Sequence, residues 1–184
     1  MNARDIPNLI SVIRIFLTIP VVWLLLEHRF GWVLFLFALA GLSDGLDGFL
    51  AKRYGWQSRL GGLLDPLADK VLLVSSFLSL GWLGFLPVWL VLLVILRDLV
   101  IVTGALVYNF TIEELEASPS LISKFNTLVQ ILLVLAVVLD RGLLGLPQVL
   151  IETLVWLTLL STLLSGGDYV WEWGHKAARE RRRD

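Results

Sequence analysis

The sequence predicts an all-α integral membrane protein, a bundle of six transmembrane helices. The chain has 184 residues, of which 57% are hydrophobic and 17% charged, and this is too apolar for a soluble domain of that size. About 20 predominantly apolar residues span a bilayer, and glycine, proline and charged clusters divide the chain into six stretches of roughly that length. The connections are short, so consecutive helices are expected to pack as antiparallel neighbours.

The first three spans are predicted at residues 8–26, 32–52 and 61–81. Polar and glycine residues at 28–31 and 55–59 interrupt the apolar pattern after the first and second spans. Gly84 and Pro87 separate the third span from the fourth, because glycine and proline are the strongest local interruptions of regular structure.

The last three spans are predicted at residues 87–108, 121–139 and 146–165. Polar stretches at 111–120 and 140–145 separate them. Residues 1–184 are therefore expected to form a single membrane domain without internal repeats. Its basic tail, from about residue 168 to 184, is expected either as an amphipathic segment on the inner leaflet or as a disordered, solubilising tail.

Lysine and arginine near the ends of the spans predict the orientation, because cytoplasmic connections carry an excess of them. Six spans place both termini on one side, which holds ten such residues: Arg4, Lys52, Arg53, Arg59, Lys124, Lys176, Arg179, Arg181, Arg182 and Arg183. Only Arg29 and Arg141 lie on the other side. We therefore expect cytoplasmic termini and a cytoplasmic active site in a bacterial inner membrane.

The charge balance and the lack of cysteine exclude several functional classes. The 15 Lys and Arg residues nearly balance 16 Asp and Glu residues, which gives no general attraction for nucleic acid, and no such partner is expected. The chain has no cysteine, which excludes disulfides, thiolate nucleophiles and zinc sites built on cysteine. Any metal must therefore use oxygen or imidazole ligands.

Four aspartates stand inside the second and third spans. Asp44 and Asp47 lie in the second, and Asp65 and Asp69 in the third. Spacings of three and four residues place each pair on one helix face, and the short connection lets the pairs face each other. Each uncompensated charge costs roughly 3 kcal/mol or more at such depth. Magnesium, calcium or manganese would compensate them, and two ions could clamp a phosphoryl group during in-line displacement.

Two other interpretations of these acids compete with a metal site. Lys52, Arg53 or Lys70 could neutralise some of the aspartates, and the acids could instead form a proton or cation pathway in a transporter. The small residues nearby favour an enzyme, because they let the backbone approach a bulky ligand. They are Gly48, Ala51, Gly61 and Gly62.

These positions form a pattern that resembles the signature of the CDP-alcohol phosphatidyltransferases. The pattern is Asp44-x2-Asp47-Gly48-x2-Ala51-Lys52-x8-Gly61-x3-Asp65-x3-Asp69. It departs from the family in one position, since Lys52 stands where arginine is usual. Lysine keeps the charge but loses the bidentate fork of arginine, which weakens the expected contact with a diphosphate.

The resemblance implies a chemistry and a role for each residue of the pattern. Two divalent cations, Mg²⁺ or Mn²⁺, would be held by Asp44, Asp47, Asp65 and Asp69. Asp69 would also be the general base on the acceptor hydroxyl, and CMP would leave as the phosphatidyl group is transferred from CDP-diacylglycerol. The cytidine diphosphate is expected along Asp47, Gly48, Ala51, Lys52 and Gly61. A homodimer is also implied by the resemblance.

Positions outside the pattern bear on the acceptor. Within the family, residues 8–14, 64–70, 97–98 and 122–127 resemble the CMP-forming cardiolipin synthases. The related phosphatidylglycerophosphate synthases usually carry Arg-Glu at 97–98 and a second lysine at 126. Glycerol 3-phosphate is a monoester near charge −2, whereas phosphatidylglycerol is a diester at −1 and needs fewer cations.

Phosphatidylglycerol is therefore the expected acceptor, and glycerol 3-phosphate is the alternative. Four residues are expected to contact the acceptor phosphate: Arg97, Lys124, Asn126 and Arg14. Packing of Arg97 with Asp98, and anchoring of a helix end by Lys124, remain the structural explanations for those charges. A transporter of ions or metabolites remains the third functional hypothesis.

Overall fold

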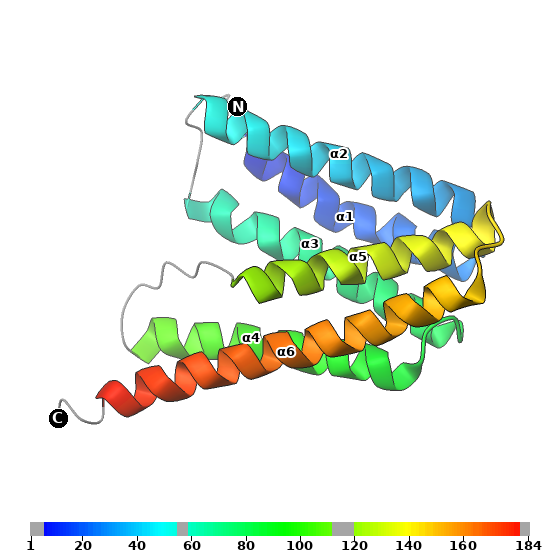
Figure 1. The fold of residues 1–184 in the computed structure, drawn as a ribbon. Coiled ribbons are helices and arrows are strands. Elements are labelled where there is room, and N and C mark those ends of the chain that lie inside the picture. Colours follow the sequence, from blue (N-terminus) through cyan, green and yellow to red (C-terminus); the bar gives the residue numbers. More distant parts are fainter. Residues whose placement is uncertain (1–5, 55–58, 112–119, 181–184) are drawn as a thin grey trace. The chain divides into compact units, whose positions relative to one another are not determined.

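The computed structural model describes residues 6–54, 59–111 and 120–180, and these residues form six α-helices without a strand (Figure 1). The helices are α1 (Ile6–Leu26), α2 (Phe30–Tyr54), α3 (Arg59–Trp82), α4 (Val88–Thr111), α5 (Leu121–Gly142) and α6 (Gln148–Glu180). Each overlaps one predicted span, which confirms the all-α prediction.

Three of these helices are long and apolar enough to cross a membrane by length and composition. The segments are Leu9–Leu26, Leu121–Gly142 and Gln148–Tyr169, and the first part of α2 is a shorter apolar stretch, Phe30–Gly45. Helices α2 and α3 carry the four aspartates, and α4 carries Arg97 and Asp98. The described part of the chain is thus all-helical with three candidate membrane spans, and the count of six transmembrane helices stays a prediction.

The three turns that the structure describes between helices lie at the predicted breaks. His28 has a φ of 56° in the turn between α1 and α2, and Gly84 has a φ of 74° in the turn between α3 and α4. Glycine suits this left-handed conformation because it has no Cβ. The His28 ring packs edge-on against Phe30 and Phe85, at centroid distances of 5.7 and 6.1 Å.

Helix α6 is longer than the predicted span, because it continues through Gly166 and Gly167 to Glu180. A glycine pair lowers helix propensity but does not by itself end a helix. The first part of the predicted tail is therefore a continuation of α6, whereas residues 181–184 lie outside the described part of the chain.

The chain divides into two compact units. Unit 1 comprises Met1–Leu86 with Val134–Leu146, and unit 2 comprises Pro87–Leu133 with Pro147–Asp184. In unit 1, α1 packs against both α2 and α3, and its fully buried side chains include Val21, Leu25 and Phe77. This packing brings residues of α1 next to the helices that carry the aspartates.

In unit 2, α4 packs against α6. Its interior differs from that of unit 1, because many of its buried side chains are polar. They include Arg97, Asp98, Ser123, Asn126, Gln130, Thr158, Ser161, Thr162 and Ser165. Hydrogen bonds offset the desolvation of buried polar groups, and several of these side chains bond one another between helices.

Candidate functional site

The aspartates of the sequence pattern lie on two helices of unit 1. Positions 44 and 47 are in α2, and positions 65 and 69 are in α3, so the predicted spacings of three and four residues are helical in both pairs. Side chains are described for Asp44 and Asp69 only. Those of Asp47, Gly48, Ala51, Lys52, Gly61 and Asp65 lie outside the described part of the structure.

Asp44 and Asp69 are brought together by Arg14 of α1. Nη1 of Arg14 donates to Oδ1 of Asp44 at 2.8 Å and to Oδ1 of Asp69 at 2.5 Å. The Arg14 side chain is 1% exposed, whereas each carboxylate side chain is 50% exposed. One acid from each of the two helices therefore reaches the same cationic nitrogen, and both remain accessible from outside the bundle.

This arrangement fits a divalent cation. The two described carboxylates offer oxygen ligands, which magnesium and manganese prefer, and a cationic group already lies between them. Among the described side chains, no group of three or more His, Cys, Asp or Glu residues gathers into a metal cage. The side chains of Asp47 and Asp65 lie outside the described residues, and the set of four ligands stays a prediction.

Arg14 was expected at the acceptor phosphate, and its contact with the aspartates is the feature that sequence reasoning missed. The sequence predicts Lys52, Arg53 or Lys70 as neutralising cations, whereas the structure places Arg14 against Asp44 and Asp69. A signal was present, since an arginine inside an apolar span requires a partner of opposite charge. The partner could not be identified from sequence because it depends on how α1 packs against α2 and α3.

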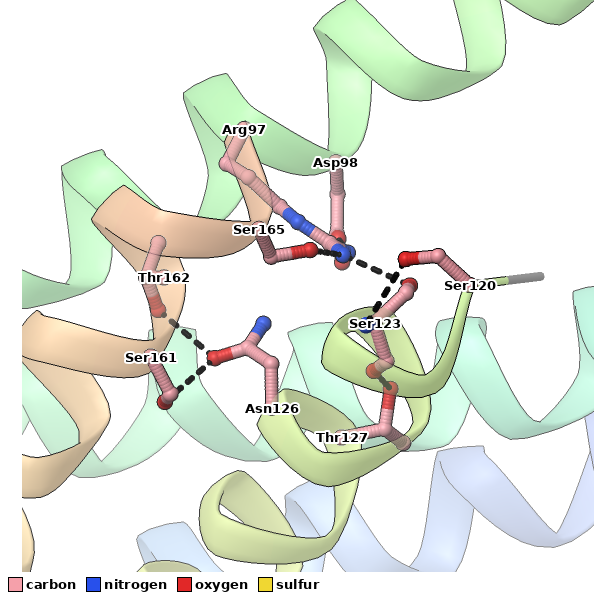
Figure 2. A network of polar contacts seen from close by, with 9 residues as sticks. All are labelled: Arg97, Asp98, Ser120, Ser123, Asn126, Thr127, Ser161, Thr162 and Ser165. Atoms are coloured by element: carbon pink, nitrogen blue, oxygen red, sulfur yellow. Dashed lines mark hydrogen bonds and ion pairs between the residues drawn. The ribbon is translucent and has the colours of Figure 1, made fainter. Parts of the chain in front are cut away.

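Arg97 is the centre of a polar network in unit 2 (Figure 2). Its Nη1 donates to Oδ1 of Asp98 at 2.7 Å, and its Nη2 donates to Oγ of Ser123 at 2.7 Å and to Oγ of Ser165. The guanidinium carbon lies 5.9 Å from the ring centroid of Tyr169. Arg97 thus connects α4, α5 and α6 through contacts made almost entirely out of solvent.

Asn126 joins the same interior from α5 (Figure 2). Its Oδ1 accepts hydrogen bonds from Ser161 at 2.8 Å and from Thr162 at 3.0 Å. Its Nδ2 has no hydrogen-bond partner in the described part of the chain, and the same holds for Nε of Arg97. Two predicted acceptor residues, Arg97 and Asn126, therefore each retain a buried donor nitrogen.

The other two predicted acceptor residues lie elsewhere. Lys124 is exposed at the start of α5, and Arg14 belongs to unit 1. The polar interior of unit 2 contains one further residue that the sequence did not single out. Gln130 is fully buried, and neither amide atom has a hydrogen-bond partner among the described residues. It lies four residues after Asn126, which places both on one face of α5.

Comparison with known proteins adds evidence that is independent of this geometry. The family model described as CDP-alcohol phosphatidyltransferase matches residues 4–164. The CMP-forming cardiolipin synthase of Rattus norvegicus is 40% identical over 151 residues, which cover 73% of this chain and 50% of that protein.

A CMP-forming cardiolipin synthase of Streptomyces coelicolor is 40% identical over 109 residues, covering 55% of this chain and 51% of that protein. A chloroplastic CDP-diacylglycerol–glycerol-3-phosphate 3-phosphatidyltransferase of Oryza sativa is 33% identical over 184 residues, covering 90% of this chain and 56% of that protein. The chain spans about half the length of these curated relatives.

Proposed function

The chain belongs to the CDP-alcohol phosphatidyltransferase family, and from this premise we propose that it joins CDP-diacylglycerol and phosphatidylglycerol into cardiolipin and releases CMP. The observation that carries the proposal is the convergence of Asp44 and Asp69 on one cationic nitrogen. It supports an acidic site between α2 and α3, where the family pattern expects one. Similarity to CMP-forming cardiolipin synthases supports the choice of acceptor.

The residues that would hold two Mg²⁺ or Mn²⁺ ions are Asp44, Asp47, Asp65 and Asp69. When bound, such ions supply charge neutralisation and alignment of the phosphoryl oxygens. Asp69 accepts the proton of the acceptor hydroxyl as general base. The hydroxyl oxygen then forms a bond to the phosphorus that carries the lipid, and the bond from that phosphorus to the oxygen of CMP breaks.

Substrate contacts follow the same pattern. The cytidine diphosphate lies along Asp47, Gly48, Ala51, Lys52 and Gly61. Arg97 and Asn126 of unit 2 are proposed to contact the phosphodiester of phosphatidylglycerol, and the acceptor contacts of Lys124 and Arg14 stay predictions. The unpartnered nitrogens Nε of Arg97 and Nδ2 of Asn126 support this assignment within the described residues, because buried donors without partners favour an oxygen acceptor.

Glycerol 3-phosphate is the alternative acceptor. The specific observation in its favour is the similarity to the Oryza sativa enzyme, which extends over 90% of this chain. Purified protein supplied with CDP-diacylglycerol, Mn²⁺ and each acceptor in turn decides between them, with products identified by mass. Cardiolipin formation is expected. Phosphatidylglycerophosphate without cardiolipin would overturn the acceptor, and no CMP release with either acceptor would overturn the activity and leave transport as the competing class.

The six helices are proposed to span a bacterial inner membrane as a homodimer with both termini in the cytoplasm. The side that holds both termini carries most of the Lys and Arg near the helix ends, which supports its cytoplasmic location. Cysteines introduced singly at positions 3 and 178 should be shielded from an impermeant thiol reagent in intact cells, and one at position 142 should react. Reaction at 3 and 178 with shielding at 142 would reverse the orientation.

A further inference from the structure

A single guanidinium nitrogen links carboxylates from two helices at the candidate metal site. Nη1 of Arg14 lies 2.8 Å from Oδ1 of Asp44 and 2.5 Å from Oδ1 of Asp69. The three residues come from α1, α2 and α3, so this contact connects all three helices at the site. The 2.8 Å contact with Asp44 has the length of a charge-assisted hydrogen bond, and such bonds are roughly twice as strong as neutral ones.

Arg14 approaches the carboxylates from the inside of unit 1. Its side chain is 1% exposed, against 50% for each aspartate side chain. Arginine stays charged in proteins, and a buried charge requires compensation. Asp44 and Asp69 therefore neutralise Arg14, and Arg14 in turn reduces the repulsion between two acids held close together.

We propose that Arg14 is the resident counter-cation of the acidic site: it holds Asp44 and Asp69 together without divalent cations, and it competes with such cations for both carboxylates. This inference rests on the proposed function, since it assumes that the aspartates bind a metal. It gives Arg14 a positioning role that precedes any contact with the acceptor.

Because Arg14 competes with the cation, its removal should lower the stability of the metal-free protein and raise the affinity for a divalent cation. Without the charge of Arg14, the repulsion between Asp44 and Asp69 loses this compensation, so the metal-free protein loses stability. A divalent cation then meets two carboxylates without the like charge of Arg14 beside them. A purely structural arginine would instead change stability by the same amount with and without metal, and a residue that only orients ligands would weaken metal binding when removed.

The test uses the full chain in detergent and Mn²⁺ as the probe ion. Binding is measured from the electron paramagnetic resonance signal of free Mn²⁺, and thermal unfolding is followed in excess chelator and in saturating Mn²⁺. Arg14→Met should have a lower midpoint of thermal unfolding than wild type in chelator, and saturating Mn²⁺ should restore most of that loss. The same variant should bind Mn²⁺ on the order of tenfold more tightly than wild type. Arg14→Lys keeps the charge and should bind Mn²⁺ close to the wild-type affinity.

Arg97→Met is the matched control, because Arg97 is also a buried arginine and is paired with Asp98 in unit 2. It should lower the midpoint equally in both conditions and leave Mn²⁺ affinity unchanged. An equal loss in both conditions for Arg14→Met, or weaker Mn²⁺ binding, would overturn the inference. Failure of the wild-type protein to bind Mn²⁺ would instead overturn the metal site of the proposed function, and with it the premise of the inference.

Discussion

Removal of the Arg97 side chain should destabilise the protein by about 3–5 kcal/mol, which is the usual cost of breaking a buried ion pair. Arg97 and Asp98 are 2.7 Å apart, with side chains 4% and 8% exposed. Arg97→Met leaves the Asp98 charge in this interior without its arginine. The hydrogen bonds to Ser123 and Ser165 add less, because such bonds between membrane helices average about 0.6 kcal/mol and reach about 1.7 kcal/mol.

A double-mutant cycle isolates the ion pair. Arg97→Met/Asp98→Leu removes both charges, and replacement of a buried pair by apolar side chains is often neutral. The double variant should therefore be at least about 2 kcal/mol more stable than Arg97→Met alone, and Ser165→Ala should cost about 0.6–1.7 kcal/mol. Unfolding in mixed micelles with increasing dodecyl sulfate, followed by tryptophan fluorescence, measures each value. A double variant no more stable than the single would refute the reasoning.

Two further predictions concern single positions. A Cβ at Gly142 would lie 2.7 Å from the Cβ of Phe30, so Gly142→Ala should lower the free energy of unfolding by about 1–3 kcal/mol. Gly31→Ala is the control in the same unfolding assay, because its new Cβ meets nothing within 4 Å. Equal unfolding midpoints for the two variants would contradict the close packing. Asn126→Lys should raise the ratio of phosphatidylglycerophosphate to cardiolipin, because a well-placed charge-assisted contact with a dianion contributes about 1.5–3 kcal/mol. An equal loss of both products would show that Asn126 serves packing with Ser161 instead.

The helices could be predicted from sequence because their signals are local. Apolar stretches of membrane length and breaks rich in glycine and proline predicted all six elements, with ends within a few residues of those observed except in α6. That helix continues past Gly166 and Gly167 to Glu180. Ser165, just before the glycine pair, is hydrogen-bonded to Arg97. A Cβ added at Gly166 would lie 3.7 Å from Cγ of Arg97, so this glycine packs against the arginine side chain. Tertiary packing of this kind cannot be read from a glycine pair.

The acidic site could be predicted in part. The spacing of Asp44 and Asp69 within the family pattern follows from the sequence alone, and the structure brings both side chains to Arg14. Their role as metal ligands stays a prediction. The identity of that shared cation depends on three helices meeting, so the sequence predicts Lys52, Arg53 or Lys70 in its place. Gln130 was missed for a related reason, since burial of a mid-helix amide depends on which face of α5 turns inward.

The central claim is that the aspartates of α2 and α3 carry metal-dependent transfer of a phosphatidyl group. The most direct measurement is CMP release from CDP-diacylglycerol and phosphatidylglycerol by wild-type, Asp69→Asn and Glu152→Gln proteins in Mn²⁺. Glu152 is exposed on α6, bonded to Gln148, and its variant should keep wild-type activity. Asp69→Asn should lose nearly all CMP release, as should wild type in excess chelator. Full CMP release by Asp69→Asn, or by wild type in chelator, would contradict the account.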